Sequence, residues 1–325
     1  MSRRTRPEEH PDPVEAVFEA HRTGALLSLA TSGSTGSGRR EVVRTTQSWW
    51  CSFDAYSDLT GIRAGDRVWV PGPLRSTMNL FAAVHARWAG GSLAGDPATA
   101  THACLTPTQL DQRGHELPRG TTVVVAGAHL SAPAATRAAD RGLRVGHYYG
   151  AAELSFVAWG TSSGDLLPFP GVKLEIRDAP REGTIWVRSP YLCDGYDGAP
   201  GPLVRDASGW ATVGDLGRLD GRALRVLGRP EAIVTGGATV LVDDVERVLA
   251  SVARAPIAVH AVRHPTMGQL VAVTLTDAAD RPALEQHARS HLPSSHRPRA
   301  WRVVPVLPLT AGGKPDRARL QEQAG

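Results

Sequence analysis

Short apolar runs in the first half of the chain predict buried strands. The runs occupy residues 24–30, 121–126 and 143–148, and helical spacing of apolar residues marks residues 13–21 and 132–141. An alternation of strands and helices is typical of an α/β layer whose ligands bind at the strand ends. We therefore expect a binding site in the loops that follow these strands.

The pattern changes after residue 171. Alternating runs at residues 172–176 and 184–187 predict an antiparallel β segment. Residues 195–221 are rich in Gly, Pro and Asp. Together these segments indicate a β-rich subdomain that ends near residue 227.

The last part of the chain predicts a compact α+β unit. Its strands are expected near residues 232–240, 257–263, 270–276 and 301–307, and its helices over 243–253 and 282–292. The predicted organisation is an N-terminal domain over residues 1–227, a connection over 228–231 and a C-terminal domain over 232–325.

The composition is that of an ordinary globular protein. Of the 325 residues, 42% are hydrophobic and 21% are charged, and the formal net charge of +4 comes from scattered arginines. No long run of like charges indicates a nucleic-acid tail. No apolar run reaches membrane-spanning length, and residues 7–13 are too polar for a secretory signal. We expect a cytoplasmic protein without a nucleic-acid or membrane partner.

Isolated cysteines predict no metal or disulfide chemistry. Cys51, Cys104 and Cys193 lack CxxC spacing and a neighbouring histidine cluster. We expect buried or bystander thiols.

Aromatic and imidazole side chains give no catalytic signal of their own. His102, His129 and His147 are expected to form structural hydrogen bonds, and the adjacent Trp49 and Trp50 to pack in the core.

A polar loop follows the first predicted strand. It contains Thr31, Ser32, Gly33, Ser34, Thr35, Gly36 and Arg39. Small residues let main-chain N–H groups approach phosphate oxygens, and hydroxyls donate hydrogen bonds or meet a metal. A flexible linker has a similar composition, but the position after a buried strand favours phosphate binding. A Walker-type loop needs Lys followed by Ser or Thr, whereas Arg39 follows Gly38 here, so that type is excluded.

With four later segments, this loop resembles the adenylate-forming enzymes, which include acyl-CoA synthetases, peptide-synthetase adenylation domains and luciferases. The segments are YYGAAE at 148–153, GWATVGDLG at 209–217, GRPEAIVTGG at 228–237 and PLTAGGKPDR at 308–317. They occur in the family's order. The resemblance implies an α/β fold with a truncated large N-terminal domain, a β-rich subdomain and a small C-terminal α+β lid domain.

The resemblance also implies roles for particular residues. ATP would be held by the phosphate loop, from Thr31 to Gly36 with Arg39, and by Tyr149, Gly150, Asp215 and Arg229. Glu153, with Thr35, would hold Mg²⁺, and Glu231 would be the hinge. Taken alone, Glu153 also fits a carboxylate at a helix start and Asp215 an Asx turn.

Lysine is scarce in this chain. Of 36 basic residues only Lys173 and Lys314 are lysines, and a compact ammonium is not interchangeable with a planar guanidinium. Composition alone leaves Lys314 as solvated surface. The resemblance implies that Lys314 bridges a substrate carboxylate and the α-phosphate of ATP, and that CoA or a carrier-protein thiol then takes the acyl group.

The chain departs from the family at several places. Arg39 replaces a lysine, Ala152 replaces Thr or Ser, and only 30 residues precede Thr31. Shortened members of this kind resemble o-succinylbenzoate–CoA ligases, so the acid is expected to be carboxylic and aromatic. The family's histidine is absent from residues 71–78, where Arg75 is a candidate partner for a second carboxylate or, alternatively, a solvated side chain.

Three functions stay open on the sequence. The first is an AMP-forming acid–CoA ligase, compatible with a homodimer. The second is a stand-alone adenylating enzyme that loads a carrier protein or another nucleophile. The third is a degenerate nucleotide-binding protein, which Ala152 and the short N-terminal part motivate.

Overall fold

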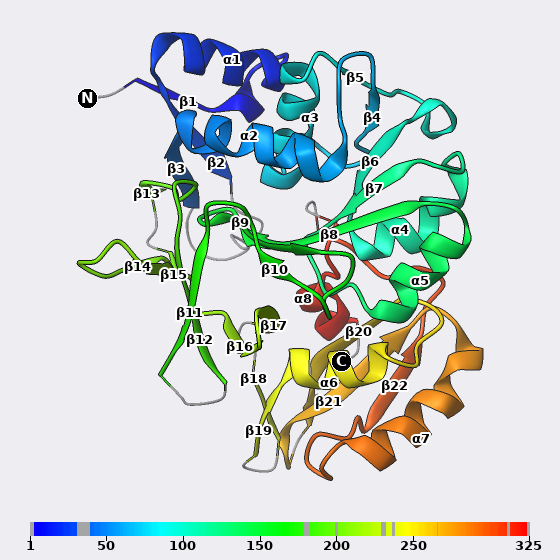
Figure 1. Ribbon diagram of the computed structural model, residues 1–325. Helices are drawn as coiled ribbons and strands as arrows, with labels where there is room; N and C mark the ends of the chain where they lie inside the picture. Colours follow the sequence, from blue (N-terminus) through cyan, green and yellow to red (C-terminus); the bar gives the residue numbers. More distant parts are fainter. Residues whose placement is uncertain are drawn as a thin grey trace.

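The computed structural model describes residues 3–30, 40–178, 182–198, 201–228, 232–235, 238–264, 266–310 and 313–323. Within these residues the strands form four sheets, three before residue 229 and one after residue 231. Figure 1 shows the last of these sheets, with its helices in yellow to red, as a body below the N-terminal part. No helix of the described residues is long and apolar enough to cross a membrane.

The central sheet has the order β10-β9-β8-β7-β6-β4-β5. Its strands are β4 Arg67–Trp69, β5 Ser92–Leu93, β6 His102–Leu105, β7 Thr122–Val125, β8 Arg144–Ala151, β9 Ser155–Gly160 and β10 Leu167–Pro168. β5, β4, β6, β7 and β8 are parallel, and β9 and β10 add antiparallel neighbours. The loops after β6, β7 and β8 therefore meet at one edge.

Helices cover both faces of this sheet. They are α2 Gln47–Thr60, α3 Thr77–Trp88, α4 Pro107–Arg113 and α5 Ala132–Asp140, whereas α1 Pro13–Thr23 packs on α3 and on strands Arg4–Thr5 and Leu26–Ala30. Because side chains alternate along a strand, Val124 of β7 packs into the core with α2 and α3, whereas Val123 and Val125 pack with α4 and α5. Burial on both faces explains the unbroken apolar run of this parallel strand.

A smaller sheet has the order β1-β2-β3-β13 and carries the strand before the polar loop. Its strands are β1 Arg4–Thr5, β2 Leu26–Ala30, β3 Arg40–Thr45 and β13 Gly195–Gly198. The expectation that this strand shares a layer with residues 121–126 is therefore wrong. β2 is buried, but it pairs with β1 and β3 in a sheet of its own.

Strand β3 was not predicted because two of its charged side chains are buried. Glu41 is 2% exposed and accepts hydrogen bonds from Ser28 and from Arg6 Nε, at 2.8 Å for the latter. Arg44 is fully buried and donates to Ser155 Oγ at 2.7 Å. Hydrogen bonds inside the protein offset part of the cost of burying these charges, and a hydropathy pattern does not register those partners.

The third sheet is the β-rich subdomain. Its strands are β11 Lys173–Arg177, β12 Gly183–Arg188, β14 Val204–Arg205, β15 Ala211–Thr212, β16 Leu216–Asp220 and β17 Ala223–Gly228. The predicted antiparallel pairing of 172–176 with 184–187 is confirmed, since Leu174 lies opposite Val187 and Ile176 opposite Ile185.

The C-terminal residues form a sheet with helices on both faces. Its elements are β18 Ala232–Thr235, β19 Ala238–Leu241, α6 Val242–Ala250, β20 Ile257–His264, β21 Gly268–Leu275, α7 Arg281–His291, β22 Ala300–Val303 and α8 Arg317–Glu322. Val259 of β20 packs with α6 and α7, whereas its neighbour Ala258 packs with Leu320 of α8. The predicted α+β character is confirmed, although the strand expected to reach 307 ends at Val303.

Helices α2 and α3 were not predicted. Residues 79–86 of α3 are all buried, so the helix lacks the polar face that makes an amphipathic period visible. Helix α1 was predicted because it is one-sided. Asp12 accepts from Val14 N and Glu15 N at its start, and Gly24 adopts φ 68° at its end.

Candidate functional site

Four distant parts of the chain converge over Gly127, which follows β7. A Cβ built on Gly127 would lie 3.7 Å from Thr106 Cγ2, 3.8 Å from Met78 Sδ and 3.8 Å from Lys314 Cε. Thr106 follows β6, and Met78 lies in the first turn of α3. The strand ends of an α/β sheet are where ligands bind, and here Lys314 reaches that edge from the C-terminal body.

Close packing seats the segment that carries Lys314. Gly313 has φ 76°, and a Cβ on it would come within 2.9 Å of Thr106 Cγ2. Thr310 N donates to Lys314 O at 2.7 Å, and Thr310 Oγ1 accepts from Lys314 N at 3.3 Å. Lys314, which pairs with Thr310 through these two hydrogen bonds, is exposed. The turn therefore presents its side chain toward the edge of the central sheet.

Thr106 and Met78 were missed from the sequence. A signal existed for Thr106, because Thr106-Pro107-Thr108-Gln109 has the spacing of a capping box, and both hydrogen bonds of that box form at the start of α4. No sequence signal marks Met78. Its position follows only from the packing of α3 against the sheet.

The structure brings Tyr149 and Asp215 together. Tyr149 lies near the end of β8, and its hydroxyl donates to Asp215 Oδ2 at 2.7 Å. Asp215 is 8% exposed and immediately precedes β16. Its main-chain oxygen accepts from Ile185 N at 2.8 Å, and Gly214 before it has φ 80°. These contacts fix the direction in which the carboxylate points.

Glu153 lies in the turn between β8 and β9, not at a helix start. The turn is tight: Ser155 has φ 56°, and a Cβ on Gly150 would come within 2.0 Å of Ser155 O. The Glu153 side chain is 7% exposed, and its Oε1 accepts from the Tyr196 hydroxyl at 2.8 Å. Only glycine fits at position 150, so the YYG spacing is required by this hairpin.

Arg44 packs behind the same turn. Its guanidinium donates to Ser155 Oγ at 2.7 Å and to Tyr191 O at 2.5 Å, while Nε has no partner among the described residues. Burial lowers the pKa of Arg44 to about 10, and Glu153 and Asp194 among its neighbours oppose that shift. Arg44 therefore stays charged at neutral pH beside a buried carboxylate.

Several predicted residues fall outside the described residues. They are Thr31, Ser32, Gly33, Ser34, Thr35, Gly36, Arg39, Arg229 and Glu231. The strands that flank the first group, β2 and β3, pair antiparallel with Ala30 opposite Glu41. Gly228, before the second group, has φ 92°, and a Cβ there would overlap the Asp243 carboxylate.

Arg75 lies exposed in the loop before α3, three residues from Met78. No ion pair to a described residue holds it. Arg75 thus lies in the loop that leads into the helix start that carries Met78.

His147 and His102 form hydrogen bonds within the fold, as expected for structural histidines. His147 lies within reach of Val125 O and Ser163 Oγ, at 2.8 and 2.9 Å, and burial lowers its pKa to about 4. His102 lies within 3.2 Å of Thr60 O. Trp49 is buried, as expected, and Cys104 and Cys193 are buried thiols while Cys51 is exposed.

No cluster of three or more His, Cys, Asp or Glu residues suited to a metal occurs in the described part of the chain. A single carboxylate, Glu153, fits Mg²⁺ that arrives with a nucleotide, because Mg²⁺ in such sites takes one or two carboxylates plus phosphate oxygens. The donor set therefore matches a substrate-borne cation and not a resident metal cage.

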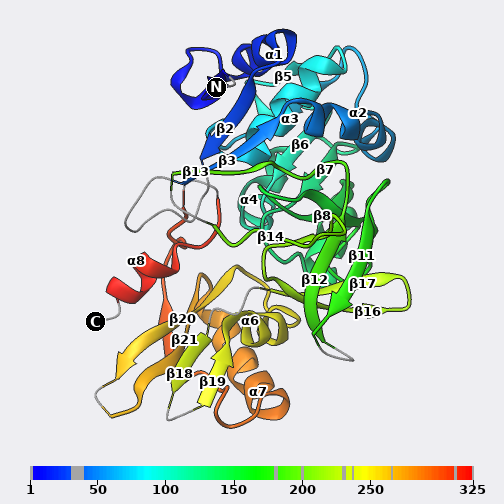
Figure 2. The ribbon, with the colours of Figure 1, turned by 90° about the vertical axis from the view of Figure 1, so that its left-hand side faces the viewer.

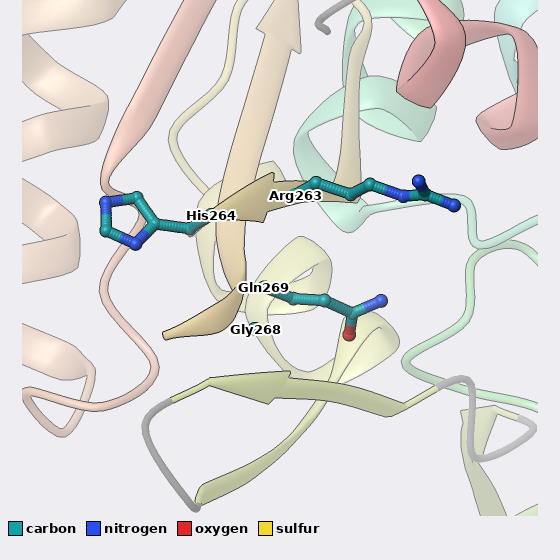
Figure 3. Close-up of a pocket in the computed structure, with 4 residues that line it drawn as sticks. All are labelled: Arg263, His264, Gly268 and Gln269. Carbon is teal, nitrogen blue, oxygen red and sulfur yellow. The ribbon is translucent and has the colours of Figure 1, made fainter. Parts of the chain in front are cut away.

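An open depression lies at the far end of the β20–β21 hairpin. It is lined by Arg263, His264, Gly268 and Gln269, and Figure 3 shows the side chains of Arg263 and His264 pointing away from each other. None of these four residues belongs to a segment that the resemblance singles out. We assign it no chemistry.

One protein-family model matches the C-terminal body. Residues 231–314 match the model of the AMP-binding enzyme C-terminal domain. This span runs from the residue predicted as hinge to Lys314.

Comparison with other proteins extends the similarity to more than 90% of the chain. A probable 2-succinylbenzoate–CoA ligase of Mycobacterium tuberculosis is 29% identical over 91% of this chain and 80% of its own length. E. coli MenE, solved as a variant with bound OSB-AMS, is 24% identical with a TM-score of 0.76, over 92% of this chain and 69% of that one. The amide bond synthetase McbA of Marinactinospora thermotolerans is 26% identical with a TM-score of 0.69, over 92% and 69% of the two chains.

Proposed function

Because the chain belongs to the adenylate-forming, AMP-binding enzymes, we propose that it is an AMP-forming acid–thiol ligase. The enzyme would use ATP to adenylate a carboxylic acid and then transfer the acyl group to CoA. The convergence of Lys314 with Thr106 and Gly127 at the strand edge is the observation that carries this proposal. It places a cation from one body beside the loops that would hold ATP and the acid.

The nucleotide would lie between the ends of β8 and β16. Asp215, an acceptor-only group when ionised, is suited to both ribose hydroxyls, and Tyr149 orients it through the 2.7 Å hydrogen bond. The family's pattern assigns Arg229 to the ribose as well. The phosphates would bind the loop from Thr31 to Arg39, whose two ends are held by the β2–β3 pair.

Adenylation joins two anions. An oxygen of the acid attacks the α-phosphorus, and the bond from that phosphorus to the bridging oxygen breaks, so pyrophosphate leaves. Positioning and charge screening account for most of the barrier reduction in such reactions. Lys314 would contact both the acid and the α-phosphate, and Glu153 would hold the Mg²⁺ that neutralises the phosphates.

In the acyl-transfer step, a thiol must reach the carbonyl carbon that Lys314 would lie beside during adenylation. The thiol sulfur attacks the carbonyl carbon of the acyl-adenylate, and AMP leaves as the carbon–oxygen bond to the phosphate breaks. Rotation of residues 232–325 about the connection 228–231, with Glu231 as pivot, would withdraw Lys314 and open a path for the thiol, in the manner of a lid.

The acid would occupy the space by Met78 and Thr106, at the start of α3. Arg75 stands three residues before Met78 and would pair with a second carboxylate on an aromatic acid such as a succinylbenzoate. The M. tuberculosis relative named as a 2-succinylbenzoate–CoA ligase supports this class of acid.

The proposal is tested with a panel of acids, ATP and Mg²⁺. Pyrophosphate release and hydroxylamine trapping of the acyl product report adenylation without any need for CoA, and addition of CoA then reports thioester formation. We expect activity with aromatic acids that carry a second carboxylate. ATP binding without pyrophosphate or hydroxamate for any acid would instead support a nucleotide-binding protein without ligase activity, the role that Ala152 motivates.

A second acceptor is favoured by one comparison. McbA, named as an amide bond synthetase, is similar over 92% of this chain, so an amine or a carrier-protein thiol is the alternative to CoA. Partition of a preformed acyl-adenylate between CoA, a carrier protein and a panel of amines separates these outcomes.

A further inference from the structure

Tyr196 joins two parts of the candidate site that lie far apart in sequence. It lies on β13, which pairs antiparallel with β3 so that Tyr196 is opposite Val42 and Gly198 is opposite Arg40. Figure 2 shows β13 beside β3, near the start of that strand. The Tyr196 side chain thus reaches Glu153 from the strand next to the one that leaves the polar loop.

The Tyr196 hydroxyl is held at both of its hydrogen-bonding functions. It donates to Glu153 Oε1 at 2.8 Å and accepts from Leu203 N at 3.0 Å. The ring packs flat against Gly201, because a Cβ built there would come within 2.1 Å of the ring Cζ. The hydroxyl therefore has one position, and so does the carboxylate oxygen that it meets.

The main chain on either side of Glu153 is also fixed. Cys193 N donates to Glu153 O at 2.8 Å, which ties the hairpin turn to the segment that leads into β13. Arg44 bonds both Ser155 on one side and Tyr191 on the other. Among the described residues, Glu153 Oε2 receives no hydrogen bond. One carboxylate oxygen is thus engaged by a described side chain and the other is not.

We propose that Tyr196 is a positioning residue, which orients Glu153 so that its second oxygen meets the Mg²⁺ of the bound nucleotide. Groups that hydrogen-bond a metal-ligating carboxylate set its direction, and their loss typically weakens metal binding by about 10- to 100-fold. This inference rests on the proposed function, because it presumes that the chain binds magnesium–ATP.

The test is Tyr196→Phe, which removes one oxygen atom and keeps the ring. ATP binding is measured by calorimetry at increasing MgCl₂, with no acid present. ATP affinity should increase with Mg²⁺, and we expect the MgCl₂ concentration at the midpoint of that increase to rise by about 10-fold in the variant. ATP affinity without Mg²⁺ should stay unchanged. Gly201→Ala, which displaces the ring, should shift the Mg²⁺ dependence in the same direction.

Tyr191→Phe is the matched control. The Tyr191 hydroxyl also donates a partly buried hydrogen bond, to Pro170 O at 2.7 Å, but not to Glu153. Both variants should lose similar thermal stability, and only Tyr196→Phe should change the Mg²⁺ dependence. In a Glu153→Gln background, Tyr196→Phe should add no further shift, because the effect travels through that carboxylate.

The outcomes separate this inference from the proposed function. A wild-type chain that binds no magnesium–ATP would overturn both. Wild-type binding with an unchanged Mg²⁺ dependence in Tyr196→Phe would overturn the positioning role alone. An equal shift in Tyr191→Phe, or a further shift in the Glu153→Gln background, would also overturn it, since either result would show a general loss of packing.

Discussion

The two halves of the candidate site differ in how they are held. Glu153 and Asp215 are less than a tenth exposed and are hydrogen-bonded to tyrosines of the same N-terminal body. Lys314 is exposed and belongs to the C-terminal body, where the neighbouring Gly313 packs on Thr106 and the Lys314 side chain lies near Gly127. A group needed throughout the reaction gains from being fixed, whereas a group needed in one step must be able to leave.

Replacing Lys314, the exposed group of the site, should have the largest effect on activity. We expect Lys314→Ala to slow adenylation by roughly 100- to 1,000-fold, the scale of losing one group that stabilises developing charge. Thiol capture of a supplied acyl-adenylate should change little. Both half-reactions are followed separately by pyrophosphate release and thioester formation.

Lys173→Ala is the control for that variant. Lys173 is the other lysine of the chain and lies exposed on β11. It should leave both half-reactions unchanged. Equal loss of both half-reactions in Lys314→Ala would remove the proposed role.

Asp215→Asn probes the fixed half. Hydrogen bonds to a charged group contribute about 1.5–3 kcal/mol, so the KM for ATP should rise roughly 10- to 100-fold. The turnover number should change far less, because the ribose is bound equally before and during the chemical step. Steady-state kinetics at saturating acid measure both constants.

Asp220→Asn, at the far end of the β16 strand that Asp215 precedes, serves as its matched variant. Asp220 is exposed and pairs with Arg218 and Arg225. It should leave the KM for ATP as it is. A fall in turnover without a change in KM for Asp215→Asn would contradict a ribose contact.

Two glycine variants sharpen the contrast between the halves. Gly150→Ala would clash with Ser155 O, so we expect the free energy of unfolding to fall by roughly 1–3 kcal/mol. Gly313→Ala would push against Thr106 and should reduce adenylation with a smaller loss of stability. Urea unfolding and pyrophosphate release measure the two effects.

Gly95→Ala provides the reference for both glycine variants. A Cβ there meets no atom within 4 Å, so stability and activity should stay near wild type. Equal stability loss in Gly150→Ala and Gly313→Ala would argue that the two halves are held alike.

Acid should lower the stability of the two bodies by different amounts. This is the smallest of the expected effects, and it is absent at neutral pH. Burial lowers the pKa of His147 to about 4 from 6.5. As pH falls from 6.5 to 4, the unfolded chain takes up a proton at this side chain while the folded chain does not. The free energy of unfolding therefore falls over this window and is unaffected above it.

His147→Gln should remove part of that acid loss. His260→Gln tests the same effect in the C-terminal body, where burial also lowers the pKa of the histidine. Exposed His115 supplies the control, and urea unfolding at pH 7, 5.5 and 4.5 measures the slopes. An identical slope in wild type and His147→Gln would mean that His147 is not buried as described.

Sequence patterns predicted best those elements whose buried side chains are apolar and whose exposed side chains are polar. The run at 121–126 became β7, and the one-sided helix at 13–21 became α1 with its Asp12 cap. They failed for α3, which has no polar face, and for β3, whose Glu41 and Arg44 are buried with hydrogen-bond partners from distant parts of the chain. Hydropathy reports the cost of burying a side chain alone and not the partners that offset it.

The sequence by itself determined the chemical inventory and its order: a scarce lysine at 314, carboxylates at 153 and 215, and the glycines that their turns require. Tertiary structure decided which of these groups meet. The pairing of β13 with β3 brings Tyr196 to Glu153, and the packing of Gly313 on Thr106 brings Lys314 to the strand edge. Such contacts join residues more than forty positions apart, and local propensity contains no information about partners at that range.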